Sequence, residues 1–241
     1  MEDLSDVVVV VPAFNEQEAL PGVIEELRQA VPGATVIVVD DGSVDATAEV
    51  ASAAGSRLIQ LPFNIGVGGA LRAGLLAAQR DGAQAAVQCD ADGQHPPGSI
   101  PDLLAGLADA DIVIGARFAG EGDYHVRGPR GWAMSFLATV MSRLHRTPLT
   151  DVTSGFRAFG PRAIEVLSRE LPPDYLGDTV EALVIAKQYG LVVRQIPVSM
   201  RARQGGVASH PPFKAMLFLF RVLLILGLAL VRLVGRKARQ R

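Results

Sequence analysis

Cysteine is almost absent from this chain. The 241 residues contain one cysteine, Cys89, which excludes an internal disulfide and a cysteine-rich zinc site. Aromatic residues are scarce at 5%, and neither sign of charge dominates, because 23 Lys and Arg stand against 25 Asp and Glu for a net charge of −2. That balance argues against a nucleic-acid-binding protein. The N-terminal run Met-Glu-Asp-Leu-Ser-Asp is acidic and has no apolar core, so we expect no secretory signal.

Apolar runs of strand length alternate with helical patterns along the first half of the chain. The first run is β-branched throughout and stops at Pro12, as expected of a strand buried on both faces. Strand followed by helix at short spacing predicts an α/β fold, with a Rossmann-like, mostly parallel sheet flanked by helices. The predicted strands are Val7–Val11, Thr35–Val39, Arg57–Leu61, Ala85–Cys89 and Ile112–Gly115, and the helices between them end near Ala30, Ala54, Arg80 and Leu107.

The pattern is looser beyond Arg117. We expect, in order, a loop over 119–130, a helix over Gly131–Leu144, a short strand after Gly155, a helix starting at Pro161, a helix over Thr179–Tyr189 and a strand over Val192–Met200. In the first strand-helix unit, Asn15 is expected to cap a helix that starts at Glu16.

Two carboxylates one residue apart follow the run that ends at Cys89. In extended backbone, residues i and i+2 point the same way, so Asp90 and Asp92 are expected to present their oxygens together at the carboxyl end of the strand. Such a pair suits a hard divalent cation, Mg²⁺ or Mn²⁺, to which Gln94 can add a neutral oxygen. The other interpretation is a polar turn that only caps the strand, since Gly93 also favours a turn.

Polar residues gather at one rim of the predicted sheet. In open α/β sheets, ligands bind in the crevice outside the carboxyl ends of the strands. The opposite rim, with loops such as Pro32-Gly33 and Asp81-Gly82, has no comparable set. A shared binding site therefore explains the following residues better than separate turns do: Glu16, Asp40, Asp41, Asp90, Asp92 and Arg117.

Five motifs stand in order along the chain. They are Val-Pro-Ala-Phe-Asn-Glu from Val11, Val-Asp-Asp-Gly-Ser-x-Asp from Val39, Asn-x-Gly-x-Gly from Asn64, Asp-Ala-Asp-Gly-Gln-His-Pro from Asp90 and Ser-Gly-Phe-Arg-Ala-Phe from Ser154. Together, from about Val7 to Arg203, the chain resembles the family 2 glycosyltransferases of the GT-A fold. Within that family it is most similar to the dolichyl- or polyprenyl-phosphate mannose or glucose synthases.

The resemblance implies an inverting, metal-dependent hexosyltransferase that uses Mg²⁺ or Mn²⁺. Such an enzyme moves a hexose from GDP-mannose or UDP-glucose to a polyprenyl or dolichyl phosphate. The residues implied for the nucleotide sugar are Pro12, Phe14, Glu16, Asp40, Asp41, Asp90, Ala91, Asp92, Gln94, Arg117, Arg201 and Arg203. Asp90, Asp92 and Gln94 would hold the metal, and Asp92, Arg117 and Arg130 would be catalytic, with Arg127 a further candidate for binding phosphate.

The acceptor leaves alternatives open. A hydroxyl acceptor, in a saccharide or small metabolite, would need a general base, for which Asp178 or Glu181 is available. A lipid phosphate would not, because its second pKa of about 6 leaves it largely dianionic at neutral pH. No histidine stands between Leu149 and Tyr189, which favours the phosphate. The chain departs from the synthase pattern after Arg201-Ala-Arg203, where His210 stands in place of an expected lysine.

Two other function classes remain. A sugar nucleotidyltransferase also combines magnesium-binding carboxylates with a Rossmann-like sheet, but it would release pyrophosphate instead of a nucleoside diphosphate. A module that only binds a partner protein is the remaining option, and it predicts that no nucleotide binds in the presence of Mn²⁺.

An apolar segment with a basic stripe closes the chain. We expect a glycosyltransferase domain over 1–210 and a membrane-associating helix with a basic tail over 211–241. Phe213–Val234 is long enough as a helix, about 33 Å, to cross a bilayer. Its cations line up at helical spacing, and this favours a helix lying on an anionic membrane surface, peripheral or monotopic, at the cytoplasmic face. The alternatives are packing on the domain, packing against a second copy in a homo-oligomer, or a full span.

Overall fold

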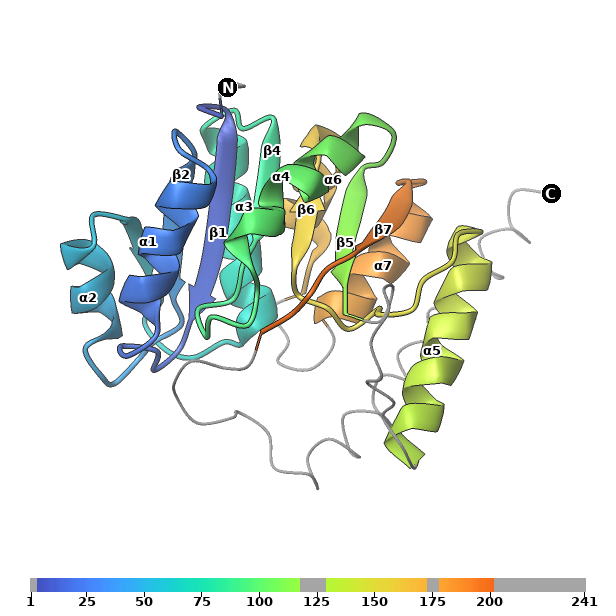
Figure 1. The fold of residues 1–241 in the computed structure, drawn as a ribbon, viewed down its shortest axis with the longest axis horizontal. Coiled ribbons are helices and arrows are strands. Elements are labelled where there is room, and N and C mark those ends of the chain that lie inside the picture. The colour runs from blue at the N-terminus through green and yellow to red at the C-terminus, as the bar shows by residue number, and fades with distance from the viewer. Residues whose placement is uncertain (1–3, 118–128, 173–177, 202–241) are drawn as a thin grey trace.

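The computed structural model describes residues 4–117, 129–172 and 178–201. Within them, a 7-stranded sheet has the order β3-β2-β1-β4-β6-β5-β7 (Figure 1). The strands are β1 (Val7–Ala13), β2 (Thr35–Asp40), β3 (Arg57–Gln60), β4 (Ala85–Gln88), β5 (Ile112–Ala116), β6 (Arg157–Phe159) and β7 (Val193–Pro197). The helices are α1 (Leu20–Ala30), α2 (Thr47–Ala53), α3 (Val67–Arg80), α4 (Ile100–Ala105), α5 (Pro129–His145), α6 (Pro161–Glu170) and α7 (Asp178–Gln188), with short 3₁₀ turns at Pro97–Ser99 and Gly106–Ala108.

Both faces of the sheet are covered by helices. Alternate residues of β1 show why, because Val8 and Val10 pack with α3, α6 and α7 on one face, whereas Val9 and Val11 pack with α1 and α4 on the other. Helix α3 lies very close to β1. A Cβ on Gly74 would lie 2.2 Å from Cγ1 of Val10, so only glycine allows this approach.

One strand runs against the others. β6 is antiparallel to both of its neighbours, β4 and β5, while the remaining pairs in the sheet are parallel. The predicted mostly parallel, Rossmann-like sheet is therefore confirmed. The sequence also predicted a short strand after Gly155, but its local pattern carried no information on its direction or on its place between β4 and β5.

The prediction for the start of the first helix is wrong. Helix α1 begins at Leu20 instead of Glu16, and Asn15 does not cap it. Asn15 adopts a φ of 56° and its side-chain oxygen accepts a hydrogen bond from the backbone N–H of Val44 at 3.0 Å. The residues before α1 thus form a loop that is bonded to the loop after β2.

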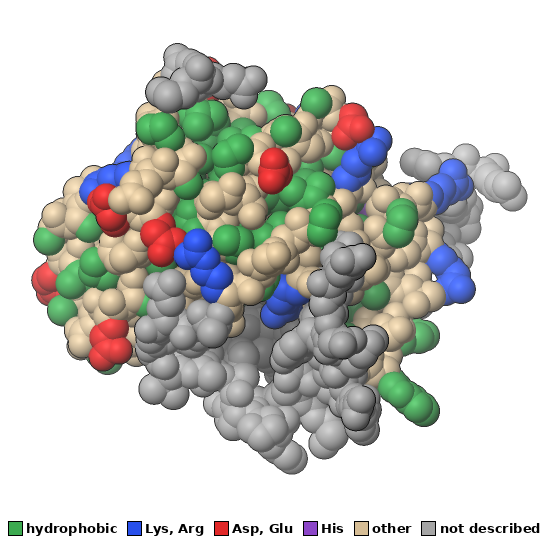
Figure 2. All heavy atoms as spheres, in the orientation of Figure 1, with side chains coloured by type: hydrophobic (Ala, Val, Ile, Leu, Met, Phe, Trp, Pro, Cys, Tyr) green, Lys and Arg blue, Asp and Glu red, His purple; other side chains and the backbone are tan. Residues whose placement is uncertain are grey.

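The expected division at residue 210 and the expected helix over Phe213–Val234 lie outside the described residues. Among the residues that are described, no helix is both long and apolar enough to cross a membrane. On the face covered by α1, α2 and α4, the described acidic and basic side chains are interspersed, and several acidic side chains lie beside basic ones (Figure 2). No extended patch of like-charged side chains covers that part of the described surface, which agrees with the small net charge.

Candidate active site

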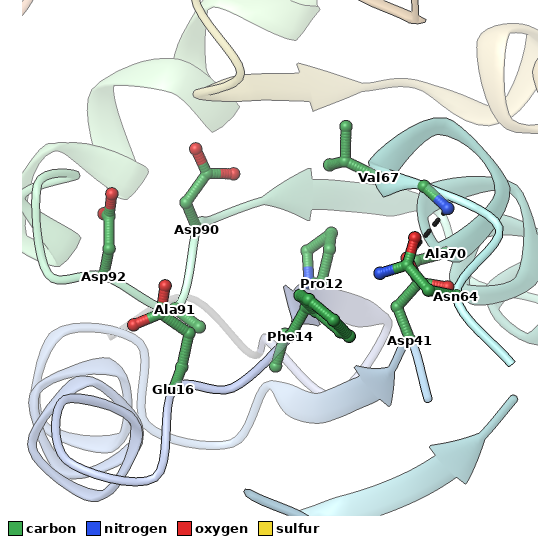
Figure 3. Close-up of a pocket in the computed structure, with 12 residues that line it drawn as sticks. Pro12, Phe14, Glu16, Asp41, Asn64, Val67, Ala70, Asp90, Ala91 and Asp92 are labelled. Atoms are coloured by element: carbon green, nitrogen blue, oxygen red, sulfur yellow. Dashed lines mark hydrogen bonds between the residues drawn. The ribbon is translucent and has the colours of Figure 1, made fainter. Parts of the chain in front are cut away.

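A cavity of about 270 Å³ opens at the carboxyl ends of β1, β2 and β4, beside the start of α3 (Figure 3). It therefore lies at the rim where the sequence placed a ligand crevice. Its lining residues are Pro12, Ala13, Phe14, Glu16, Asp41, Asn64, Gly66, Val67, Ala70, Asp90, Ala91 and Asp92.

One end of this cavity is acidic. The side chains of Glu16, Asp90 and Asp92 come together there from the loops after β1 and β4 (Figure 3). Asp92 is 8% exposed, and one of its oxygens accepts a hydrogen bond from the backbone N–H of Gln94 at 3.0 Å. Gln94 itself is not among the lining residues, and its carbonyl oxygen accepts a hydrogen bond from the backbone N–H of Arg201.

The other end is formed by Asp41 and Asn64 (Figure 3). The two carboxylate oxygens of Asp41 accept hydrogen bonds from the backbone N–H groups of Ile65 and Gly66, both at 2.8 Å. Burial raises the pKa of Asp41 above its ordinary value. The two backbone hydrogen bonds oppose this rise, and the negative charge of the neighbouring Asp40 adds to it. Asp41 therefore fixes the loop that precedes α3 and holds Asn64 at the cavity.

Asp40 has a different role from that of Asp41. It is buried, it does not line the cavity, and its carboxylate accepts a hydrogen bond from the backbone N–H of Ser43 at 3.0 Å. The sequence motif assigned both aspartates to the nucleotide sugar, but the structure brings only Asp41 to the cavity. Asp40 shapes its own turn instead, through this local bond from its side chain to the backbone three residues further on.

Polar contacts between two loops hold Phe14 and Glu16 at the cavity. The backbone N–H of Asn15 donates to Oγ of Ser43 at 2.9 Å, and that of Glu16 donates to Oγ1 of Thr47 at 2.9 Å. From the sequence, Asp45 or Ser43 was expected to cap the helix after β2, and Thr47 had no assigned role; in the structure the hydroxyls of Ser43 and Thr47 accept these bonds from the loop after β1. Ser43 lies within the second motif, and Thr47 lies two residues after it. The only sequence signal for these contacts was that this motif is rich in side chains that can bond to backbone groups.

Arg117 follows β5 and is held by a buried carboxylate. Its Nε donates to Asp151 at 2.8 Å and its backbone N–H donates to the same oxygen at 3.2 Å. The side chain of Asp151 has no exposed surface, whereas that of Arg117 is 40% exposed. Arg117 is not a lining residue of the cavity.

The other predicted arginines divide into two groups. Arg201 is described, and its guanidinium pairs with Glu26 on α1 at 2.5 Å instead of lining the cavity. Arg127, Arg203 and the side chain of Arg130 lie outside the described part of the chain. The roles predicted for them from the resemblance remain predictions.

Arg157 is a buried arginine for which the sequence analysis proposed no role. It is 1% exposed and donates to the backbone carbonyls of Ser154, Thr179 and Val152 at 2.8, 2.8 and 2.9 Å. It thereby joins the turn before β6 to the start of α7. Its position within the fifth motif was the only sequence signal.

The acidic end provides oxygen ligands but not a closed metal site. In the described ranges, no group of three or more His, Cys, Asp and Glu side chains is gathered closely enough to hold a metal ion alone. Carboxylates are nevertheless the ligands that Mg²⁺ and Mn²⁺ prefer, and an open pair leaves positions for phosphate oxygens. Cys89 is completely buried and does not line the cavity, so its thiol does not face this site.

Comparison with known proteins identifies the family. The sequence model of glycosyl transferase family 2 matches residues 8–167. The chain belongs to glycosyl transferase family 2. It is therefore a glycosyltransferase, and the family predicted from the five motifs is confirmed.

Two relatives cover most of this family 2 chain. The undecaprenyl-phosphate mannosyltransferase of Micrococcus luteus is 31% identical over 211 residues, which are 83% of this chain and 85% of the relative. The polyprenol monophosphomannose synthase of Mycolicibacterium smegmatis is 31% identical over 211 residues, 83% of this chain and 79% of that protein.

A solved structure confirms the predicted GT-A fold. Glucosyl-3-phosphoglycerate synthase from Mycobacterium tuberculosis, in complex with Mn²⁺, UDP-glucose and phosphoglyceric acid, superposes with a TM-score of 0.67 at 23% sequence identity. The match covers 90% of this chain and 76% of that one.

Proposed function

We propose that this glycosyltransferase moves a hexose from a nucleotide sugar to a polyprenyl phosphate, with inversion at the sugar and with Mg²⁺ or Mn²⁺ bound at Asp90 and Asp92. One observation carries the proposal. A single cavity joins an end lined by Asp90 and Asp92 to an end lined by Asp41 and Asn64, and it lies at the carboxyl ends of parallel strands. The names of the two relatives support the acceptor.

The two ends of the cavity suit two parts of a nucleotide sugar, namely its nucleoside and its diphosphate. Asp41 and Asn64 offer hydrogen-bonding groups, next to Pro12 and Phe14, for a base and ribose. Asp90 and Asp92 face the other end, where the diphosphate would lie. A divalent cation held there would neutralise the charge that builds up on the departing nucleoside diphosphate. Without a cation, these carboxylates would repel the diphosphate.

Arg117 is our candidate for a phosphate contact at the second half of the sheet. Asp151 fixes its backbone and its Nε, so that the arginine is anchored at the end of β5. A guanidinium held in this way, with Nε and Nη2 both donating to Asp151, is oriented in advance, which lowers the entropic cost of a contact with phosphate oxygens. Arg130, Arg201 and Arg203 remain predictions for the same role.

A phosphate acceptor also fits the histidines that the structure describes. The ring of His95 accepts a hydrogen bond from the backbone N–H of Asp90, and Nε2 of His145 lies 3.0 Å from the carbonyl oxygen of Leu183. Both rings thus contact backbone groups and neither lines the cavity, which argues against either as a general base. A polyprenyl phosphate needs none, since its phosphate is already ionised.

The acceptor proposed here is a membrane lipid. We therefore propose that the enzyme works at the cytoplasmic surface of a membrane, where the segment after residue 210 attaches it, alone or as a homo-oligomer. The composition of that segment supports the attachment, because Arg232, Arg236 and Arg239 extend its basic stripe without acidic neighbours.

The test is a transfer assay with the full-length protein. Mn²⁺, radiolabelled GDP-mannose or UDP-glucose and polyprenyl phosphate are supplied, and label is followed into organic solvent. We expect transfer to polyprenyl phosphate but not to the matching free polyprenol. Asp92→Asn should abolish transfer while circular dichroism shows an intact fold. Transfer to a soluble saccharide would contradict the lipid acceptor, and release of pyrophosphate would identify a nucleotidyltransferase.

A further inference from the structure

Asp90 is held from three sides in the loop after β4. Its backbone N–H donates to Nδ1 of His95 at 2.9 Å, and Nε2 of Gln88 donates to its Oδ1 at 3.3 Å. A Cβ on Gly155 would lie 3.3 Å from both carboxylate oxygens, so this glycine packs directly against them. The side chain of Asp90 is 38% exposed and lines the cavity. The carboxylate thus faces the cavity with restricted freedom to turn.

His95 contacts Asp90 twice. Because Nδ1 accepts a hydrogen bond, the proton of the neutral ring is on Nε2. Nε2 lies 3.5 Å from Oδ2 of Asp90, which places the positive edge of the ring beside the carboxylate. His95 is 6% exposed and is not a lining residue of the cavity. Its side chain therefore does not face the cavity itself but contacts Asp90, which does.

The ring of His95 is fixed in turn by Phe156. The two rings are stacked, with their centroids 4.9 Å apart and their planes at 23°. Phe156 is completely buried, and behind it a Cβ on Gly115 would lie 2.8 Å from Cδ1 of the phenylalanine ring. The end of β5, the turn before β6 and His95 therefore form one packed series of contacts that ends at Asp90.

We propose that His95, supported by Phe156, is a positioning residue that holds Asp90 ready to bind a divalent cation. The inference rests on the proposed function in one respect, that Asp90 is a cation ligand. Groups that orient metal ligands from behind typically contribute tenfold to a hundredfold in metal affinity. The sequence alone favours a structural role for His95, which precedes Pro96 and Pro97, in closing a turn.

Two substitutions separate the contacts of His95. His95→Phe keeps a ring against Phe156 but removes the acceptor for the N–H of Asp90. His95→Asn places an amide oxygen near the position of Nδ1 but removes the ring. We would titrate the full-length protein with Mn²⁺ in the presence of GDP and, in parallel, UDP, and measure free Mn²⁺ by electron paramagnetic resonance. His95→Phe should raise the apparent Kd about tenfold or more. His95→Asn should raise it less.

A matched pair of phenylalanines controls for lost packing. Phe156 and Phe159 are both completely buried, and of the two only Phe156 stacks on His95. Phe156→Leu and Phe159→Leu should lower the midpoint of thermal unfolding by similar amounts. Only Phe156→Leu should also weaken Mn²⁺ binding at temperatures well below that midpoint. Equal effects of the two variants on Mn²⁺ affinity would overturn the proposal, because they would show a general loss of stability.

Asp92→Asn in the same titration separates the two proposals. If Asp92→Asn loses Mn²⁺ affinity while His95→Phe binds as the unmodified protein does, the cation site stands and the positioning role is wrong. If neither variant changes the affinity, the cation is not held at this loop and both proposals fail. Weakened binding in both variants, with recovery in His95→Asn, is the result that we expect.

Discussion

The two halves of the sheet carry opposite charges at their carboxyl ends. After β1, β2 and β4 the chain places Glu16, Asp41, Asp90 and Asp92 around the cavity. At the other half, the described arginines hold protein groups. Arg117 binds Asp151, the buried Arg157 binds backbone carbonyls, and Arg201 pairs with Glu26. The acidic half thus presents its charge to a ligand, while the basic half uses much of its charge to join loops.

This difference predicts which substitutions affect stability and which affect transfer. In the basic half, removing a buried charge leaves backbone groups without donors, so the protein should unfold more easily. In the acidic half, removing the carboxylate of Asp90 or Asp92 should leave the fold intact and slow the transfer.

Arg157→Met should have the largest effect. It removes the donor for three backbone carbonyls in a buried place, and we expect a loss of about 3 kcal/mol in the free energy of unfolding, measured by urea denaturation. Arg162→Met is the matched control, because Arg162 is an exposed residue paired with Asp111 and should cost under about 1 kcal/mol. Equal losses would mean that the buried contacts of Arg157 contribute no more than a surface pair.

Asp90→Asn should act on transfer instead. Loss of one carboxylate charge at the cavity should lower kcat about a hundredfold, which corresponds to about 2.7 kcal/mol of transition-state stabilisation. Asp111→Asn makes the same chemical change at the amino end of β5, away from the cavity, and should keep kcat within about threefold. The assay is steady-state transfer of labelled hexose. A similar kcat in the two variants would mean that carboxylates at the two rims of the sheet, at the carboxyl and amino ends of the parallel strands, matter equally for transfer.

Arg117→Lys tests whether the anchored arginine contributes to donor binding or catalysis. A lysine cannot reproduce the paired contacts of a guanidinium with Asp151 and a phosphate, so kcat/KM should fall about tenfold, or about 1.4 kcal/mol. Arg162 pairs with Asp111 at the opposite rim of the sheet, so Arg162→Lys should leave kcat/KM unchanged. An unchanged value for Arg117→Lys would restrict Arg117 to a structural pair with Asp151.

The effect that is smallest at neutral pH concerns His145. Burial lowers the pKa of His145 to about 4, from an ordinary value of 6.5. Between these values the unfolded chain binds more protons than the folded chain, so the contribution of His145 to stability is full above pH 6.5 and is lost as the pH falls toward 4. His145→Gln keeps a donor for the carbonyl of Leu183 but does not titrate. As the pH falls through this range, the unfolding free energy of His145→Gln should therefore decline less than that of the unmodified protein. Equal declines in the two proteins would show that other groups cause the loss of stability.

Much of the fold and part of the site could be predicted from the sequence. The buried strands were visible as apolar runs, because a strand covered on both faces has to be apolar throughout. The structure confirms the strands at the predicted places and at nearly the predicted bounds. Asp41, Asp90 and Asp92, which were expected at the carboxyl rim of the sheet, line one cavity there, since the place where a strand ends is a local property of the sequence.

The partners of those residues could not be predicted. Arg201 contacts Glu26 across 175 positions, and Arg117 contacts Asp151 across 34. Nothing in a local pattern distinguishes an arginine that binds phosphate from one that pairs within the protein. The same limit applied to Asn15, which looked like a helix cap and instead bonds to the loop after β2.

The sequence by itself determined that this chain is an α/β glycosyltransferase of family 2 with acidic side chains at one rim. The apolar runs, the ends of the strands and the order of the motifs can be read along the chain. Reading them does not require knowing which residues far apart in the sequence come into contact. Only the tertiary structure decided that β6 runs antiparallel between β4 and β5, and that this brings Phe156 against His95 and Gly155 against Asp90. The reason is physical, because which surfaces meet depends on packing between segments far apart in the chain.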